Sequence, residues 1–158
     1  MPDSIKKNKE AMAETIENNL RRVIIEDSPT NPVYYEKMSV LLSELIRLRK
    51  EETLEYEKYL KEIIALSAKI KKPASTGAYP VSLDTPAKQN LYDNLGKNEV
   101  LTVDMDQKIR ITKRDGWRDH KIKLKEVKYA IQEILDKHEV SEPDAESLLN
   151  LVKNQKEY

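Results

Sequence analysis

Three short tripeptides are the residues of this chain that most resemble catalytic machinery. They read Asp106-Gln107-Lys108, Asp119-His120-Lys121 and Glu126-Val127-Lys128. Each matches the second half of a metal-dependent nuclease motif, in which carboxylates hold Mg²⁺ and a lysine positions or activates water. The first half of that motif, a Pro-Asp pair upstream, is not in place, because Pro-Asp occurs only at Pro2-Asp3 and Pro143-Asp144. In a chain with 35% charged residues such tripeptides arise by chance, so we expect no nuclease chemistry.

Other familiar site patterns are also missing from the sequence. Gly96-Lys97 is the only Gly-Lys pair, and Leu91 stands where a phosphate-binding P-loop needs its first glycine. His120 and His138 each lack a second histidine four residues away, which predicts two exposed surface histidines. With no Cys there is no disulfide and no thiolate ligand. We therefore expect no catalytic, cofactor-binding or metal-binding residue in this chain.

One charged segment, from Lys108 to Lys128, is a candidate contact for DNA or for a protein partner. Three acids accompany its nine basic residues, which are Lys108, Arg110, Lys113, Arg114, Arg118, Lys121, Lys123, Lys125 and Lys128. Such clusters bind nucleic acid by neutralising phosphates and releasing counterions. A second interpretation is that the tail 136–158, with six acids and three bases, packs near the segment and neutralises it. Both interpretations stay open at the level of sequence.

Hydrophobic periodicity predicts a long helical hairpin over residues 1–72. A first amphipathic helix is expected from Ser4 to Glu26, followed by a proline-rich corner in which Asn31 caps the next helix. No Pro or Gly follows Pro32 until Pro73, which predicts one helix of about 40 residues, some 60 Å long at ~1.5 Å per residue. Its heptad seam comprises Tyr34, Met38, Leu41, Leu45, Leu48, Tyr56, Tyr59, Ile63, Leu66 and Ile70.

The seam has one gap, through Glu52, which resembles a coiled-coil stutter. Charged residues surround the gap, and we expect Arg47, Arg49, Lys50 and Glu51 to form a docking face on the long helix. The shorter first helix is expected to pack on the first half of the long one. The second half then needs a partner further along the chain.

A linker at 73–84 separates this hairpin from a group of shorter helices at 85–158. Thr85-Pro86 and Gly96 delimit the first of these helices, and Asn98 caps a second over about 99–112. Asp115-Gly116 forms a turn that places Trp117 as an anchor, and an amphipathic helix spans 121–137. Ser141 with Asp144 resembles the capping box of a last helix. The predicted fold is all-α, a helical bundle in a single domain with a long hairpin followed by shorter helices.

Composition agrees with this architecture. The 158 residues carry no net charge and include only three Gly, which argues against an all-β fold. No apolar run approaches the roughly 20 residues that cross a bilayer, and the polar N-terminus has no apolar core of a signal peptide. We expect a cytoplasmic protein without membrane contact.

Several segments resemble the C-terminal helical domain of the restriction (R) subunit of type I restriction-modification enzymes. In the order of that family they are Ala13–Arg22, Asn31–Ser39, Tyr79-Pro80, Thr85-Pro86-Ala87, Leu91–Gly96 and Asp115–Arg118. The resemblance spans nearly the whole chain. Its motifs are structural rather than catalytic.

The resemblance implies a fragment of a larger R subunit, which would be an ATP-dependent site-specific deoxyribonuclease. ATP and Mg²⁺ are then expected only for the nuclease and motor domains of that parent subunit. The helical domain would be non-catalytic and would dock the subunit onto the methyltransferase core of modification and specificity subunits. One alternative is a module that contacts duplex DNA through the basic segment 108–128. Another is a homodimer formed through the heptad seam.

Overall fold

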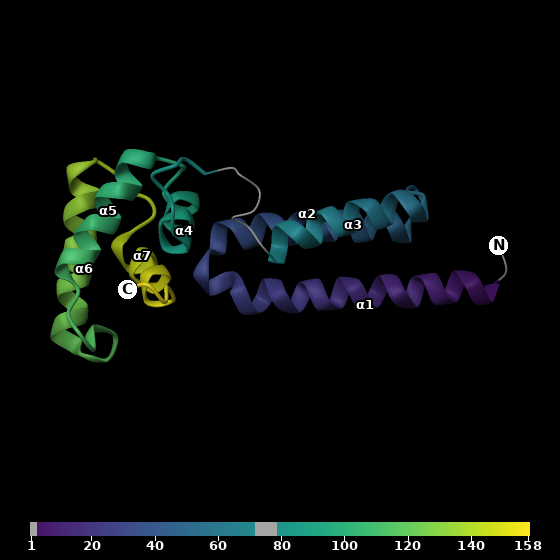
Figure 1. Ribbon diagram of the computed structural model, residues 1–158, viewed down its shortest axis with the longest axis horizontal. Coiled ribbons are helices and arrows are strands. Elements are labelled where there is room, and N and C mark those ends of the chain that lie inside the picture. Colours follow the sequence, from purple (N-terminus) through teal and green to yellow (C-terminus); the bar gives the residue numbers. More distant parts are fainter. Residues whose placement is uncertain (1–2, 72–78) are drawn as a thin grey trace. The chain divides into compact units, whose positions relative to one another are not determined.

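The computed structural model describes residues 3–71 and 79–158, and every regular element in these ranges is helical (Figure 1). The predicted all-α class is confirmed. The chain divides into two compact units, which are described separately. Unit 1 comprises Met1–Ser28 and Tyr35–Thr76, and unit 2 comprises Pro29–Tyr34 and Gly77–Tyr158.

Unit 1 is built from the helices α1 (Asp3–Asp27), α2 (Pro32–Lys50) and α3 (Tyr56–Lys71). The length of α1 agrees with the predicted first helix. The three helices of unit 1 bury the apolar side chains of Ala13, Leu20, Ile24, Met38, Leu42, Leu45, Ile46, Tyr59, Ile63, Leu66 and Ile70. The helix α3 packs against α1, and Figure 1 shows α1, α2 and α3 as the three helices of this unit.

The predicted single helix of about 40 residues is wrong, because the chain turns between Lys50 and Tyr56. Glu52 adopts a left-handed conformation with φ +56°. The Thr53 N–H donates to the Leu48 carbonyl at 3.2 Å and the Glu52 N–H to the Arg49 carbonyl at 3.1 Å. These two bonds form a Schellman motif that ends α2. The gap in the heptad pattern therefore marks a turn instead of a stutter, and the second half of the predicted helix returns to pack on α1.

The break also changes which apolar residues are buried. Leu41, predicted on the seam, is exposed, while Leu42 is buried in its place. Met12 is likewise exposed, and its neighbour Ala13 lies in the core. These shifts follow from packing on two sides, because each of the helices must now contact both others.

Unit 2 contains α4 (Pro86–Asn94), α5 (Glu99–Thr112), the 3₁₀ helix η3 (Trp117–Asp119), α6 (Lys121–Lys137) and α7 (Ala145–Lys153). One apolar cluster joins them, and its members include Leu91, Leu101, Met105, Ile109, Trp117, Ile131, Leu135, Leu148 and Tyr158. The helix α6 packs against both α5 and α7. This cluster is the core that holds the basic segment in place.

Most of the predicted helix boundaries in unit 2 are confirmed. The side chains of Thr85 and Asn98 accept the backbone N–H groups of Lys88 and Leu101, as N-caps do. Gly96 and Gly116 have φ of +66° and +72°, which glycine adopts without a steric penalty. The predicted capping box is wrong, since Asp144 itself is the N-cap of α7 and accepts from the Ser147 N–H at 2.8 Å.

The corner between α1 and α2 belongs to unit 2. A 3₁₀ turn, η1 (Ser28–Thr30), precedes Asn31, which accepts from the Tyr34 N–H at 3.2 Å and so caps α2 as predicted. The predicted linker 73–84 lies partly outside the described residues, from 73 to 78. Its remainder, 79–84, is not helical and inserts the buried Leu83 into unit 2. None of the helices in the described ranges combines the length and apolar character that crossing a bilayer requires.

Candidate functional site

The basic segment 108–128 is largely neutralised by neighbouring side chains of unit 2. Four of its nine cations form ion pairs: Lys108 with Glu133, Arg110 with Asp106 and Glu157, Arg114 with Glu126, and Lys128 with Glu146. Two of the acids, Glu146 and Glu157, come from the acidic tail. This geometry favours the interpretation in which the tail packs near the segment and cancels part of its charge.

Two further cations of the segment bind backbone carbonyls. Arg118 donates from Nε to the carbonyl of Lys153 and from Nη1 to that of Tyr158, both at 2.9 Å, and from Nη2 to the carbonyl of Gln155. Lys123 donates to the carbonyl of Asp115 at 2.8 Å. The guanidinium of Arg118 thus holds the last residues of the chain in place, which is a structural role.

Three cations of the segment remain, Lys113, Lys121 and Lys125. None of their side chains forms an ion pair or hydrogen bond with the part of the chain that the structure describes. Lys113 is half-buried, whereas Lys121 and Lys125 are exposed on α6. The available charge of the segment is therefore much smaller than its sequence indicates.

The predicted docking face at the end of α2 is also reshaped. Arg47 is exposed and bonded to Glu44 and Glu51, so these charges neutralise one another. Lys50 is exposed and has no ion-pair partner among the described residues. Arg49 does not belong to the face, because its side chain is only 9% exposed and points into unit 1.

Arg49 is part of a buried polar cluster that the sequence did not predict. Its Nε and Nη2 donate to the two carboxylate oxygens of Glu17 at 2.7 and 2.9 Å, and the Tyr59 hydroxyl donates to Glu17 at 2.7 Å. Burial, together with the bond to Glu17, raises the pKa of Tyr59. The one available signal was the position of Glu17, four residues after Ala13 and three before Leu20, on the buried face of α1.

Unit 2 contains a second cluster of the same composition. Arg110 Nε bonds both oxygens of the buried Asp106 at 3.0 Å, and the Tyr158 hydroxyl donates to the same carboxylate. The guanidinium of Arg110 lies 5.0 Å from the centre of the Tyr158 ring, and Glu157 accepts the backbone N–H of Ala87 at the start of α4. Burial raises the pKa of Tyr158, with the bond to Asp106 as the next cause. In both clusters each carboxylate oxygen accepts at least one hydrogen bond from the arginine or the tyrosine. Such bonding is typical of a carboxylate with a structural role in a packed core.

The acidic and basic residues of the nuclease-like tripeptides bond to different partners and do not come together in one site. Asp106 bonds Arg110 and Tyr158, Lys108 pairs with Glu133, and Glu126 pairs with Arg114. Within 3–71 and 79–158, no three of the His, Asp and Glu side chains are grouped closely enough to hold a metal ion.

The two histidines have separate structural roles. His120 is exposed as predicted and caps α6, since its Nδ1 accepts the Lys123 N–H at 3.3 Å. His138 was predicted to be exposed, but its side chain is only 19% exposed and lies 2.8 Å from Asp104. That bond, together with one from Lys137, lowers the pKa of the Asp104 carboxyl.

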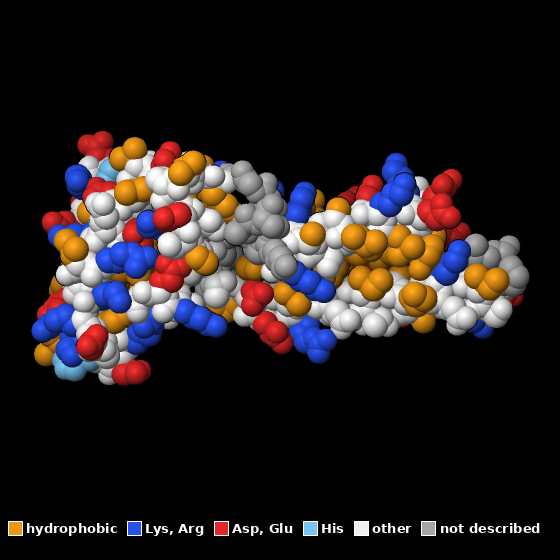
Figure 2. All heavy atoms as spheres, viewed as in Figure 1, with side chains coloured by type: hydrophobic (Ala, Val, Ile, Leu, Met, Phe, Trp, Pro, Cys, Tyr) orange, Lys and Arg blue, Asp and Glu red, His pale blue; other side chains and the backbone are white. Residues whose placement is uncertain are grey.

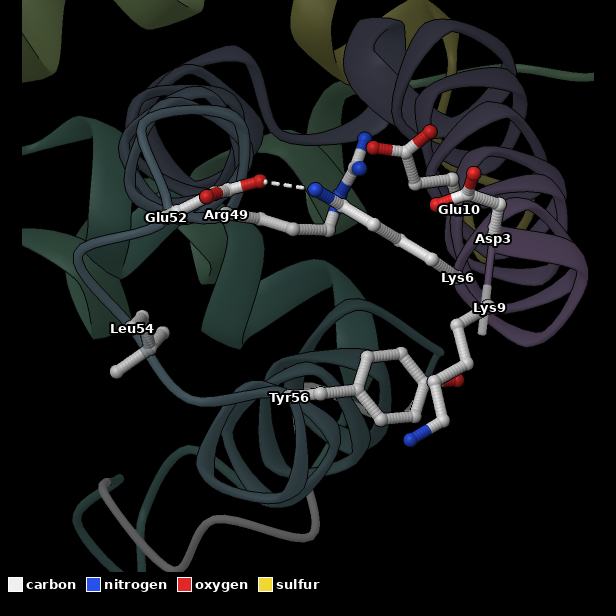
Figure 3. Close-up of a pocket in the computed structure, with 8 residues that line it drawn as sticks. All are labelled: Asp3, Lys6, Lys9, Glu10, Arg49, Glu52, Leu54 and Tyr56. Atoms are coloured by element: carbon white, nitrogen blue, oxygen red, sulfur yellow. Dashed lines mark ion pairs between the residues drawn. The ribbon is translucent and has the colours of Figure 1, made fainter. Parts of the chain in front are cut away.

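A cavity of about 420 Å³ lies in unit 1 between the start of α1 and the turn after α2 (Figure 3). Lys6 pairs with Glu52 at 2.7 Å, and the Lys9 ammonium lies 4.8 Å from the centre of the Tyr56 ring. Arg49 is held by Glu17, as described above. Each of these three cations therefore already has a partner, whereas the carboxylates of Asp3 and Glu10 in the same lining form no ion pair within the described residues.

Exposed apolar side chains are the remaining surface feature. In unit 1, Figure 2 shows them gathered over α2 and α3, where Val40, Leu41 and Ile64 are exposed. In unit 2, Ile122 and Tyr129 are exposed on α6. Apolar groups gathered on a surface are typical of protein interaction sites.

A further polar cluster lies where Asn31, Tyr79 and the helix α4 meet. Asn31 donates to Asp93 at 2.8 Å, Asn94 donates to Asn31 at 2.7 Å, and the Tyr79 hydroxyl donates to Asp93 at 2.6 Å. Asn31 is buried. These residues hold the corner segment, Tyr79 and α4 together within unit 2.

Comparison of the chain with protein-family models, with curated proteins and with solved structures gives no match.

Proposed function

We propose that this chain is a non-catalytic assembly module, the C-terminal helical domain of a type I restriction enzyme R subunit. In this role it docks the ATP-dependent translocase and endonuclease subunit onto the methyltransferase core. The modification and specificity subunits and the rest of the R subunit are its partners. The observation that carries the proposal is that most cations of the basic segment are engaged within the chain, while apolar side chains are exposed on α2, α3 and α6.

The segments that resemble the R-subunit domain support this proposal through their structural roles. Asn31 and Asp93, from two of these segments, bond one another in the polar cluster of unit 2. Trp117, from another, is buried in the core. Residues that position helices in this way define a scaffold, and a scaffold with exposed apolar helices suits assembly.

The alternative, a module that contacts duplex DNA, is less well supported, because few cations of the segment are available to bind phosphates. Nine lysine and arginine contacts to phosphates would give a slope of log K against log salt of about −8, whereas three would give about −3. Of the nine cations of the segment, only Lys113, Lys121 and Lys125 have side chains without a partner in the described part of the chain. Exposed isoleucine and valine side chains also have nothing to gain from a phosphate backbone.

A homodimer through the heptad seam has little support. Tyr59, Ile63 and Ile70 of that seam are buried within unit 1. A second copy of the chain cannot reach them without opening the unit.

The proposal is tested by capture of this chain on the cognate methyltransferase core, with and without duplex DNA, at two salt concentrations. We expect capture without DNA that persists at high salt, because apolar contacts are insensitive to screening. Capture only with DNA, lost at high salt, would favour the alternative. No capture under any condition, together with normal assembly of a parent subunit lacking this region, would refute the assembly role.

A further inference from the structure

The outer face of α6 combines exposed apolar and basic side chains over its first two turns. Ile122, Lys125 and Tyr129 are three and four residues apart, so they share one face of the helix, and Lys121 lies beside them one turn before Lys125. Ile122 is 63% exposed and Tyr129 is 68% exposed. We refer to these four residues as the α6 face.

The charge of the α6 face is available to a partner. Neighbouring lysines of α6 are occupied, Lys123 by the Asp115 carbonyl and Lys128 by Glu146. Lys121 and Lys125, in contrast, have no bonded partner in 3–71 or 79–158. The face therefore carries two uncompensated positive charges beside two apolar side chains.

The two acidic side chains of α6 nearest the face are already paired. Glu126 is bonded through both oxygens to Arg114, and Glu133, one turn after Tyr129, pairs with Lys108. Asp119 is exposed in η3, before the helix begins. Along α6 the free charge is thus positive over residues 121–129.

We infer that the α6 face binds an acidic amphipathic helix of a protein partner. This inference rests on the proposed assembly function and names the chemistry of the partner segment. Apolar side chains of the incoming helix would cover Ile122 and Tyr129, and carboxylates at its edges would pair with Lys121 and Lys125. The spacing of three and four residues is the one that two packed helices use to contact each other.

A nucleic acid fits the same face less well. Tyr129 is able to stack on a base and the lysines are able to bind phosphates, but Ile122 would remain without an apolar partner. Two phosphate contacts would contribute a salt slope of only about −2. Charge complementarity and the apolar residues together therefore favour an acidic helix.

The first test measures the affinity of the whole chain for the methyltransferase core. We expect Lys121→Glu with Lys125→Glu to weaken binding at least tenfold, and Ile122→Ser with Tyr129→Ser to weaken it as much. The matched control, Lys153→Glu with Lys156→Glu, makes the same charge change at exposed positions of unit 2 that are not on α6, and it should bind normally. Equal affinity of all variants would overturn the inference and leave the assembly function standing.

The second test does not depend on the core. Two synthetic 21-residue helices carry leucine in a heptad pattern and either glutamate or lysine at the flanking positions, and their contacts are mapped by amide chemical shifts. We expect the glutamate helix to perturb residues 121–129 and the lysine helix not to. Perturbation of these residues by a 20-base-pair duplex but not by the glutamate helix would reassign the face to nucleic acid. No perturbation by any probe would refute it.

Discussion

Removing the carboxylate of Glu17 should destabilise unit 1 more than any other single change to a charged residue there. Glu17 accepts two bonds from Arg49, at 2.7 and 2.9 Å, and one from Tyr59 at 2.7 Å, and its side chain is only 4% exposed. Glu17→Ala leaves the Arg49 guanidinium buried without a counter-charge. Breaking a buried pair in this way costs about 3–5 kcal/mol. That is a large share of the about 5–15 kcal/mol that stabilises a typical domain.

Two further variants separate the effect of the unpaired charge from the other effects of removing the Glu17 side chain. Tyr59→Phe removes one hydrogen bond to a carboxylate and should cost about 1.5 kcal/mol. Glu17→Leu combined with Arg49→Met and Tyr59→Phe removes both charges and the hydroxyl that would otherwise lose its acceptor. Apolar replacement of a buried pair is often neutral, so we expect the stability of this triple variant to lie within about 1 kcal/mol of the unmodified chain.

The assay is urea unfolding followed by helical circular dichroism. The control is Glu14→Ala, an exposed carboxylate one turn earlier on α1, which should change the free energy of unfolding by less than about 0.5 kcal/mol. A loss below about 1 kcal/mol for Glu17→Ala would refute the reasoning. A triple variant no more stable than Glu17→Ala would refute it as well.

Two other predictions concern the α2 terminus and the end of the chain. Glu52→Gly should raise the free energy of unfolding by about 1 kcal/mol, because glycine adopts φ near +56° without strain. Lys6→Ala is the control for the ion pair that this substitution also removes. Unchanged or lower stability of Glu52→Gly would contradict the prediction. Unit 2 should lose stability as the pH rises above 10, because the pKa of Tyr158 is raised in the folded state above its ordinary value of 10.0, so the unfolded chain releases this proton first. The free energy of unfolding should fall by up to about 1.4 kcal/mol per pH unit, and unfolding is followed by the fluorescence of Trp117, the only tryptophan. Tyr158→Phe should flatten this pH dependence. An equally steep slope in that variant would exclude Tyr158 as its source.

Local signals predicted the helices of unit 2 accurately. Thr85, Asn98 and Gly96 act through bonds within a few residues of themselves, so the sequence alone specifies their roles. The helix at 121–137 was predicted with its observed bounds for the same reason. The turn at Glu52 was missed because a left-handed glutamate carries no compositional signal, and the heptad gap there has two possible causes.

The contacts that decide the candidate surface were beyond such local reasoning. Arg110 and Glu157 are 47 residues apart, and Arg118 and Tyr158 are 40 apart, so no spacing rule connects them. The charges of the tail indicate that it is able to neutralise the basic segment, but composition does not identify which lysines remain free. Glu17 and Arg49 were missed as a pair because each looks like an ordinary charge on a helix surface.

The polar contacts of the final residues have a consequence for the order of synthesis. The Gln155 side chain donates to the carbonyl of Thr30 at 2.7 Å across 125 residues of sequence. At a translation rate of about 5–20 residues per second, the ribosome needs roughly 6–25 s to make the chain between these two partners. Over that interval Thr30 and the buried Asn31 have been synthesised, while the Gln155 contact that joins their segment to the C-terminal residues does not yet exist. Unit 2 is therefore completed only after Gln155 has been synthesised, and the corner segment, which is made first, is exposed to chaperones and proteases for longer than any other part of that unit.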